Sequence, residues 1–394
     1  MSDQSSYDVC VIGSGLVGAS TANALVRRGA GRVLLLDRGA PADGDSGLTF
    51  GMVRRHYTNP VLIQLAMTGT DILANWDEEV GVGSSGYVPT GYLLPVPERL
   101  ADTCRAQVKL QRELGLDTYF LTPDQINEVE PLMSLDGVAG AAYEPAGGVC
   151  DGRLMIFSWL TDALARGLEL RQNAPVAEIE MDSDRAIGVR LTDGTLIHAG
   201  QTIVTTGGWT SELLAPTGYA PPIALSRIQV AVLRLVPGAV PPAAVTSDSV
   251  SNVVVRSAAG RDIWVVAYQA DTPVISVRDD CSRDLLPGYE GAIRNALGER
   301  FPSLANAALV GGWGGAYDHT PDWHPLVGAV PGIENLWICA GWSGHGLKST
   351  PSIGRVMADL VCGSTPSINV TDLAPDRFAR GFENRLAYGP GARA

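Results

Sequence analysis

The sequence predicts an α/β protein in which a Rossmann-type dinucleotide-binding domain is interleaved with a mainly antiparallel α+β substrate domain. Two observations predict the first domain. A strand, glycine turn, helix and second strand follow one another within residues 7–36, and a strand near the C-terminus ends in another glycine-rich turn. A third predicts the second domain, because residues 223–277 form short alternating stretches rich in β-branched side chains. At 394 residues the chain suits two such domains.

The N-terminal unit has the parts of a dinucleotide-binding fingerprint in the expected order. An apolar strand over 7–12 leads into the turn GSGLVG at 13–18. A helix is predicted over 19–28 and a second apolar strand over 33–36, and Asp37 follows that strand directly. A bare glycine pattern is a weak signal, but its position between a strand and a helix makes it specific.

Each glycine of this turn has a physical role. Gly13 permits the tight turn, Gly15 lets the backbone approach a pyrophosphate, and Gly18 lets the helix pack closely on the strand. The helix N-terminus directs its partial positive charge at the phosphates. Asp37 is placed to accept hydrogen bonds from a ribose and disfavours the 2′-phosphate of NADP. The contacts predicted for this unit are Gly13, Gly15, Leu16, Val17, Gly18, Asp37 and Arg38.

Composition narrows the choice of partners. The formal net charge of −13 argues against nucleic acid or an anionic membrane surface as a partner, although a local pair of cations can still bind a small anion. Only two lysines occur, Lys109 and Lys348. Lys109 is expected on the exposed face of an amphipathic helix. The six cysteines lack metal-binding spacing, and Cys10 and Cys339 fall in apolar strand-like runs. Without a basic leader or a long apolar run, we expect a cytoplasmic protein.

The loop GLTFGMVRRHY at 47–57 combines glycines, apolar residues, two arginines and a histidine. Glycines beside bulky and charged side chains suit a backbone that passes close to a ligand. The alternative is a solvated basic turn before the helix predicted from Pro60 to Trp76.

The order of predicted elements divides the chain into interleaved segments. A meander over 168–198 and a buried strand over 201–209 belong to the dinucleotide-binding part, and a helix is predicted over 286–300 after the antiparallel region. Residues after about Phe382 are expected to form a loose tail. The predicted dinucleotide-binding segments are 1–85, 144–218 and 317–385, the substrate-domain segments are 86–143 and 219–316, and the tail is 386–394.

The second glycine-rich turn, GHGLK at 344–348, selects between FAD and NAD. Successive backbone N–H groups before a helix favour negative charge, which a reduced flavin carries at N1 and the C2 carbonyl. Nothing in NAD chemistry requires such a site. Two glycine turns at opposite ends of the chain fit an extended FAD, with the pyrophosphate on the first and the isoalloxazine on the second.

With these motifs in place, the chain resembles the D-amino acid oxidase (DAO) superfamily of FAD-dependent oxidoreductases, in its glycine/sarcosine oxidase-like branch. The resemblance covers nearly the whole length and implies a glutathione reductase-like FAD domain. The motifs that carry it are VIGSGLVG at 11–18, GMVRRHY at 51–57, Glu144-Pro145 with the following helix, TTGGW at 205–209, Tyr317 with Thr320-Pro321-Asp322, and AGWSGHGLK at 340–348.

The resemblance implies hydride transfer from the C–N unit of a neutral amine to flavin N5, followed by hydrolysis of the imine. Family members hold the substrate carboxylate with two cations, whose positions here are Arg54 and Lys348, with Arg55 as the rival of Arg54. Two cations can fix a carboxylate and orient its Cα. Further active-site positions are Tyr268, Tyr317 and Trp342. Further cofactor contacts are Thr49, Phe50, Gly51, Met52, Val176, Thr206, Gly207, Trp209, Gly344, His345, Gly346, Leu347 and Lys348, with His345 contributing its backbone more than its ring.

Two departures from the family pattern affect the expected chemistry. The cysteine that attaches flavin in monomeric sarcosine oxidases is replaced by Gly315, so FAD is expected to bind non-covalently. The lysine that assists oxygen reduction is replaced, in our alignment, by Val265.

The first interpretation is therefore an oxidase of an amino acid or N-substituted amino acid such as an N-alkyl glycine, with O₂ as acceptor and H₂O₂ as product. The alternatives are a dehydrogenase of similar substrates or a flavin subunit of a complex, a 2-hydroxy-acid oxidoreductase, and a non-catalytic flavin-binding subunit. Substrate size stays open, although four side chains could form an apolar pocket for something larger than sarcosine. These are Met52, Trp264, Trp313 and Trp342.

Overall fold

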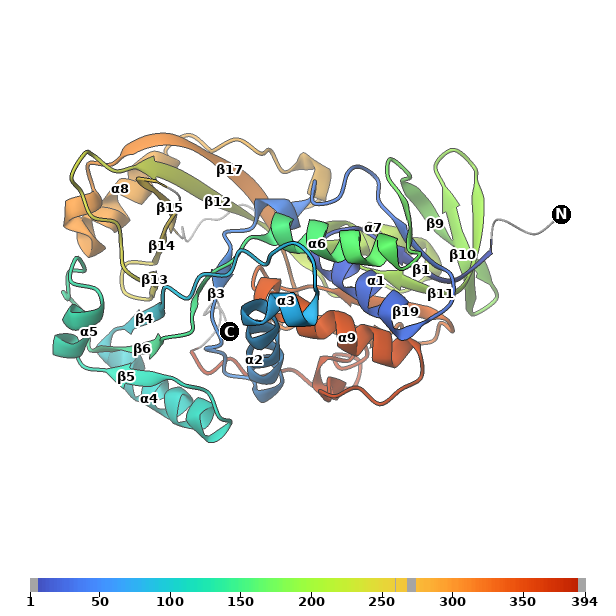
Figure 1. The fold of residues 1–394 in the computed structure, drawn as a ribbon, viewed down its shortest axis with the longest axis horizontal. Coiled ribbons are helices and arrows are strands. Elements are labelled where there is room, and N and C mark those ends of the chain that lie inside the picture. The colour runs from blue at the N-terminus through green and yellow to red at the C-terminus, as the bar shows by residue number, and fades with distance from the viewer. Residues whose placement is uncertain (1–5, 259, 268–273, 389–394) are drawn as a thin grey trace.

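The computed structural model describes residues 6–258, 260–267 and 274–388, and within them the chain forms two large sheets. Figure 1 shows the sheets in opposite halves of the molecule, connected by long strands and loops. This confirms the predicted mixed α/β architecture, with a parallel sheet and an antiparallel sheet. None of the helices in the described ranges has the length and hydrophobicity that a membrane crossing requires.

The first sheet has a parallel centre. Its described strands run in the order β18-β19-β11-β1-β2-β8, with β10 and β9 continuing from β11. The central pairings β19–β11, β11–β1, β1–β2 and β2–β8 are parallel. The strands are β1 (Ser6–Ile12), β2 (Val33–Leu36), β8 (Glu169–Arg171), β9 (Val176–Asp182), β10 (Arg185–Leu191), β11 (Leu196–Val204), β18 (Leu326–Ala329) and β19 (Leu336–Ala340).

Burial on both faces explains why the strands of this sheet are continuous apolar runs. Val9 and Val11 of β1 pack in the core that includes three helices, whereas Cys10 and Ile12 pack in the core on the side of β9 and β10. Cys339 is buried as well. The helices are α1 (Leu16–Arg28), α6 (Gly152–Ala165) and α9 (Thr350–Val361), and α1 packs against the other two.

The second sheet is antiparallel except for the pairing of β13 with β4. Its described order is β16-β12-β15-β14-β13-β4-β6-β5, and β17 pairs with β12. The strands are β4 (Tyr92–Val96), β5 (Tyr119–Leu121), β6 (Gly140–Glu144), β12 (Ala224–Arg234), β13 (Val245–Asp248), β14 (Val253–Ser257), β15 (Asp262–Ala267), β16 (Val274–Ile275) and β17 (Ala308–His319). The accompanying helices are α4 (Glu98–Glu113), α5 (Pro123–Val129) and α8 (Tyr289–Arg300).

The remaining elements connect the two sheets. The helix predicted from Pro60 is divided into α2 (Pro60–Ala74) and α3 (Trp76–Glu79), and the other pieces are β3 (Met52–Val53), β7 (Gly148–Val149) and α7 (Thr210–Leu214). Helix α2 begins at Pro60 because the Asn59 side chain caps it by accepting from the Val61 and Leu62 amides. The interleaved segment boundaries stay a prediction, and β17 crosses the one proposed at residue 316.

The loose tail predicted after Phe382 is wrong as far as residue 388. Asn384 is buried, and its backbone and side-chain nitrogens donate to the Asp322 carboxylate. The Tyr388 hydroxyl lies 2.7 Å from Nε2 of His56. These are long-range contacts, so the local composition of the segment could not indicate them. Residues 389–394 lie outside the described ranges.

Candidate functional site

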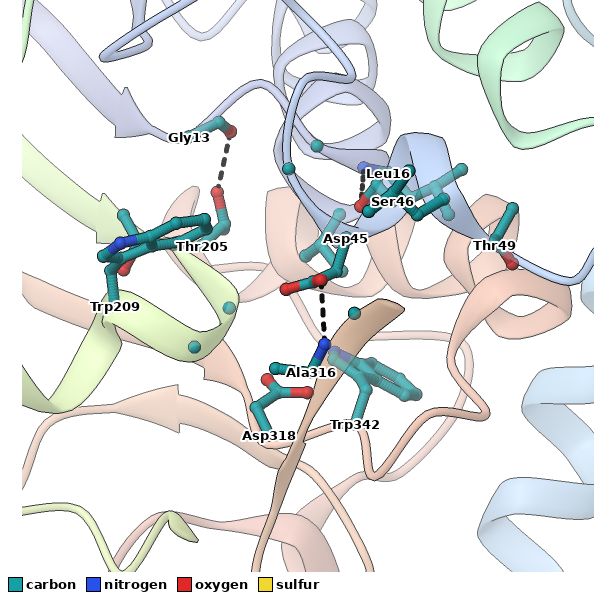
Figure 2. Close-up of a pocket in the computed structure, with 18 of the residues that line it drawn as sticks. Gly13, Leu16, Asp45, Ser46, Thr49, Thr205, Trp209, Ala316, Asp318 and Trp342 are labelled. Atoms are coloured by element: carbon teal, nitrogen blue, oxygen red, sulfur yellow. Dashed lines mark hydrogen bonds between the residues drawn. The ribbon is translucent and has the colours of Figure 1, made fainter. Parts of the chain in front are cut away.

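A cavity of about 780 Å³ is lined by residues of both sheets and of both glycine-rich turns. Most of the residues singled out from the sequence line it, and Figure 2 shows part of this lining. They are Gly13, Gly15, Leu16, Val17, Asp37, Arg38, Thr49, Phe50, Gly51, Met52, Val176, Thr206, Gly207, Trp209, Tyr317, Trp342, Gly344, His345, Gly346, Leu347 and Lys348. Gly18 and Arg54 lie behind the lining, and Tyr268 is outside the described residues.

The first glycine turn is shaped by close backbone contacts. Gly13 has a φ of +99°, and a Cβ on Gly18 would lie 1.8 Å from the Gly13 carbonyl oxygen. Helix α1 has no side-chain cap and no acidic residue in its first turn, so its N-terminal amides remain suited to an anion. The amide of Leu16 donates to Ser46 Oγ at 3.1 Å, a contact visible in Figure 2.

Asp37 is held in place at the end of β2. Its carboxylate accepts from the Ser14 amide at 2.7 Å, from the Ser14 hydroxyl at 2.6 Å and from the Gly39 amide at 2.9 Å. Oδ2 accepts both bonds from Ser14 and Oδ1 only the one from Gly39, so the remaining acceptor capacity lies on Oδ1. The position suits a hydroxyl group that donates to this oxygen.

Asp45 and Trp209 line the same half of the cavity. Asp45 accepts from the Ala316 amide at 3.0 Å, as Figure 2 shows, and forms a two-point ion pair with Arg278. The indole of Trp209 donates to Asp279 at 2.8 Å and has the guanidinium carbons of Arg38 and Arg278 5.2 and 5.0 Å from its ring centroid. Charged groups therefore join distant segments across this part of the cavity.

The second glycine turn forms the other end of the cavity. Gly344 has a φ of +74°, and a Cβ there would lie 2.3 Å from the ring of Tyr317. A short 3₁₀ turn, Leu347–Ser349, connects the glycines to α9. The His345 ring is bound within the protein, with Nε2 2.9 Å from the Trp323 carbonyl and Nδ1 3.3 Å from the Tyr57 hydroxyl. Burial, together with the charges of Lys348 and Arg54, lowers the pKa of His345 well below its usual value.

Two buried cations lie beside this end. Lys348 is 1% exposed, and its ammonium nitrogen lies 4.9 Å from the ring centroid of Tyr57. The guanidinium carbon of Arg54 lies 4.3 Å from the same centroid. Burial first, and then the nearby Arg54 charge, lower the pKa of Lys348 well below its usual value. Since none of the ion pairs found among the described residues includes Lys348, an anion in the cavity could pair with it.

The structure distinguishes Arg54 from its rival. Arg55 donates its backbone amide to Glu144 at 2.8 Å and holds the same carboxylate with Nε at 3.5 Å, so its charge is paired within the protein. Arg54 donates to the His56 carbonyl and lies near Lys348 and Tyr317, behind the cavity lining. Of the two arginines, Arg54 is thus the one next to the cavity cation.

The antiparallel sheet gives the cavity an apolar surface, which we call the apolar wall: Ile228, Val230, Val254, Val266 and Trp313. Met52 and Trp342 also line the cavity, whereas Trp264 packs against Phe50 and Trp313 outside the lining. Such a surface excludes water and accepts apolar substituents.

The interpretation of Val265 needs correction. Its side chain is fully buried in the core on the face of the sheet away from the apolar wall, beside Ala231 and Val255. Side chains alternate between the faces of a strand, so Trp264 and Val266 face the cavity side and Val265 cannot. Valine at this position therefore says nothing about positive charge in the cavity.

Comparison with known proteins places this geometry in a family. Residues 8–360 match the family model DAO, "FAD dependent oxidoreductase". The chain belongs to this family of FAD-dependent oxidoreductases. It is 28% identical over 384 residues to 4-methylaminobutanoate oxidase (formaldehyde-forming) of Paenarthrobacter nicotinovorans, covering 96% of this chain but 46% of that protein. It thus spans about half the length of that relative.

Other similar proteins are matched over most of their length. Sarcosine oxidase subunit beta of an Arthrobacter species is 26% identical, covering 95% of this chain and 92% of the relative. The crystal structure of L-proline dehydrogenase from P. horikoshii has a TM-score of 0.87 at 22% identity, covering 96% of this chain and 99% of the other. Glycine oxidase from Geobacillus kaustophilus has a TM-score of 0.82 at 22% identity, with 95% and 99% covered. The structural matches show that the fold is shared.

The residues of this flavoprotein fit an extended FAD. Gly15 lines the cavity, and it packs so tightly that a Cβ there would lie 2.8 Å from Ser46 Oγ. A single cavity is lined both by Asp37 and the first turn and by Gly344 and Lys348 of the second turn. The turns would hold the pyrophosphate and the isoalloxazine respectively, as the sequence predicts.

Several lining residues were missed in the sequence. Asp45 and Ser46 lie in a polar stretch that resembles an ordinary surface turn, and their partners are far away in the chain. Asp318, whose carboxylate accepts from the Gly341 amide at 2.8 Å, lies directly after Tyr317, and burial raises its pKa to about 6. Alternate residues of β14 and β15 lie on opposite faces of the sheet, and both faces are apolar. This alternation is the sequence signal that could have indicated the apolar wall.

Proposed function

We propose that this flavoprotein oxidises the C–N bond of an amino acid or an N-substituted amino acid such as an N-alkyl glycine. The electrons pass to O₂, giving H₂O₂, and the imine is hydrolysed. The observation that carries the proposal is the buried side chain of Lys348 at the cavity. It lies next to Arg54, and Lys348 has no ion-pair partner among the described residues.

A buried charge is costly unless it is paired, so an anionic ligand should bind where this ammonium reaches the cavity. A carboxylate is the simplest group that satisfies both an ammonium and a nearby guanidinium. When bound there, the carboxylate would fix the adjacent Cα, and the apolar wall would keep water from it. FAD, when bound, supplies the hydride acceptor.

The names of similar proteins support an amine or amino acid substrate. They refer to 4-methylaminobutanoate, sarcosine, dimethylglycine, L-proline and glycine. All of these carry an amine and a carboxylate in one small molecule, which agrees with a cavity lined by Lys348 and the apolar wall, with Arg54 nearby.

We further propose that FAD binds non-covalently. Gly315 lines the cavity and offers no nucleophile. Cys339 also lines it, but burial raises the pKa of its thiol to about 12, so very little reactive thiolate is present at neutral pH. Precipitation with acid should release all the flavin into the supernatant. Flavin that stays with the protein pellet would contradict this.

The first experiment is an anaerobic titration of the yellow protein with sarcosine, glycine, L-proline and longer N-substituted glycines. Flavin absorbance is followed, and air is then admitted. Bleaching by one of the amines with rapid recovery in air is the expected result. Bleaching that persists in air would contradict O₂ as acceptor and indicate a dehydrogenase. No bleaching by any amine would overturn the proposed substrate class and direct the search to 2-hydroxy acids.

A further inference from the structure

Arg256 lies on the cavity face of the antiparallel sheet, one cross-strand pair beyond the apolar wall. In the register of β14 with β15, Val254 pairs with Val266, and Arg256 pairs with Trp264. Val254 and Val266 line the cavity. Because side chains two residues apart share a face, Arg256 and Trp264 extend the same surface. The guanidinium therefore stands at the edge of the apolar wall.

The Arg256 side chain is held without being neutralised. Its Nε donates to the Phe50 carbonyl at 2.6 Å, and its Nη1 donates to the Ser257 carbonyl at 2.9 Å. The guanidinium carbon lies 3.8 Å from the ring centroid of Trp264. Among the described residues, Nη2 has no hydrogen-bond partner, and a Cβ on Gly51 would lie 3.5 Å from it. Since Phe50 and Gly51 both line the cavity, this nitrogen is directed to its edge.

No carboxylate among the described residues forms an ion pair with Arg256. Asp151 acts on it only through its more distant charge, since this carboxylate accepts from the Arg153 and Leu154 amides at the start of α6. Arg256 is 7% exposed, and burial lowers its pKa to about 10. A rigidly held and nearly buried guanidinium with one open donor is a suitable binding group for an anion.

Arg256 and the Lys348 ammonium belong to the same region. The charges of both act on the buried thiol of Cys150, whose backbone amide donates to the Gly51 carbonyl at 2.8 Å. Lys348 thus lines the cavity, and Arg256 stands at its edge without being one of the lining residues.

We propose that Arg256 binds a second carboxylate of the substrate. The substrate class then narrows to amino acids or N-substituted amino acids with two carboxylates, one held by Lys348 and Arg54 and the other by Arg256. This inference rests on the proposed function, because it assumes that the first carboxylate binds at Lys348.

Paired non-oxidisable ligands test the proposal on the FAD-loaded protein. Dicarboxylates from malonate to adipate are each compared with the monocarboxylate of equal carbon number, and Kd is measured from the change in flavin absorbance. The variants are Arg256→Gln, Arg256→Lys and Lys348→Met. Arg234→Gln is the matched control, because Arg234 lies on β12 of the same sheet, is exposed and pairs with Asp262. Flavin content and Tm are recorded for each variant.

In the wild type, we expect at least one dicarboxylate to bind about tenfold or more tightly than its monocarboxylate, as for a charge-assisted hydrogen bond. Arg256→Gln should remove this preference while leaving monocarboxylate binding within about threefold, and Arg256→Lys should keep part of it. The role of Arg256 would be overturned if Arg256→Gln kept the preference for the dicarboxylate, or if it weakened both ligands equally. A wild type that binds both ligands equally well would overturn it too.

The Lys348→Met variant separates this inference from the proposed function. If it weakens monocarboxylates and dicarboxylates alike, the first carboxylate site stands, whatever Arg256 does. If it weakens neither, the proposed function loses its carboxylate site. Binding of neither ligand class by the wild type would contradict both proposals.

Discussion

At the scale of single residues, burial decides what each charged side chain can do. The chain has two lysines, and they differ completely in environment: the Lys109 side chain is 79% exposed, whereas Lys348 is buried at the cavity. The same contrast separates neighbours in the chain, since Arg55 is paired with Glu144 while Arg54 lies beside Lys348. The residue type shows that a side chain can carry a positive charge. Burial and neighbouring charges decide which of these side chains can bind a ligand in the cavity.

Replacing Lys348 should test the carboxylate site directly. In Lys348→Met we expect Kd for a carboxylate ligand to rise by about tenfold or more, because the cavity loses a charged partner, while the flavin stays bound. The measurement is a flavin absorbance titration with acetate. Lys109→Met is the matched control and should leave Kd unchanged. Equal affinity in Lys348→Met would argue against this site.

The lowered pKa of Lys348 predicts how binding depends on pH. A carboxylate binds the ammonium form, which is favoured below the lysine's pKa and lost as pH rises through it. Acetate affinity should therefore be constant at lower pH and fall by about tenfold per pH unit above the lowered pKa. Measurements above pH 7 avoid titration of Asp318, whose pKa is about 6. The slope should vanish in Lys348→Met, and a slope that persists would assign the titration to another group.

At the scale of elements, tight turns and caps depend on a few close contacts. The first glycine turn brings α1 so near β1 that no side chain fits at Gly18. The motif Thr320-Pro321-Asp322 supplies a fully buried carboxylate that binds Arg377 and Asn384. The first motif shapes the cavity, and the second fastens the C-terminal segment to the strand that lines it.

Gly18→Ala should damage both folding and cofactor binding. The new methyl group would lie 1.8 Å from a backbone oxygen that cannot move independently, so we expect a loss of about 1–3 kcal/mol of unfolding free energy and much weaker FAD binding. Urea unfolding and flavin content are the measurements. Gly291→Ala in α8 is the control, because a Cβ there meets no atom within 4 Å and alanine favours helix. A stable, fully loaded Gly18→Ala protein would contradict this account.

Asp322→Asn should destabilise the protein by about 3–5 kcal/mol, because it leaves the Arg377 charge buried without its partner. Burial opposes ionisation of Asp322, but the Arg377 hydrogen bonds and charge outweigh it and lower its pKa below the ordinary 3.8. Its stabilisation is therefore present above that value and lost as pH falls further. Urea unfolding at neutral and acid pH measures both effects. Glu334→Gln, which breaks the exposed pair with Arg185, should cost no more than about 1 kcal/mol.

At the scale of the whole molecule, the cavity depends on contacts between distant parts of the chain. Residues 278–283, which we call the bridging segment, follow β16 and reach the loop after β2. Arg278 pairs with Asp45, Asp279 with Arg38, and Arg283 donates to the Asp43 carbonyl. The guanidinium groups of Arg38 and Arg278 both lie near the ring of Trp209. These contacts help to connect the two sheets, which lie in opposite halves of the molecule in Figure 1.

The bridging segment should slow the release of FAD. Arg278→Gln removes the ion pair with Asp45, and we expect FAD to dissociate about tenfold faster, because the lost charge-assisted contacts closed this side of the cavity. The release rate is measured by the rise in flavin fluorescence after dilution. Arg190→Gln on β10 breaks the ion pairs with Glu178 and Glu180, none of which lines the cavity, and should not change the rate. An unchanged rate in Arg278→Gln would show that the segment does not retain the cofactor.

The sequence by itself determined the class of fold and the family. The spacing of the glycines in the first turn, the acid after the second strand and the alternation over 223–277 are local patterns. Local patterns can be interpreted from the sequence because few backbone conformations are compatible with each of them. The resemblance to the DAO family followed from such motifs and is confirmed. The positions of Lys348 and of the second glycine turn at the cavity also agree with expectation, although their roles stay proposals.

Tertiary structure alone decided which side chains meet. It placed Val265 on the far face of its sheet, paired Arg55 with Glu144, brought Asp45 to Arg278 and packed Tyr388 on His56. It also put Arg256 on the same face of its sheet as the apolar wall. These outcomes depend on strand register and on contacts between residues 89 to 332 positions apart. A one-residue change of register moves every side chain of a strand to the opposite face of the sheet. No local sequence pattern could therefore have determined which side chains meet.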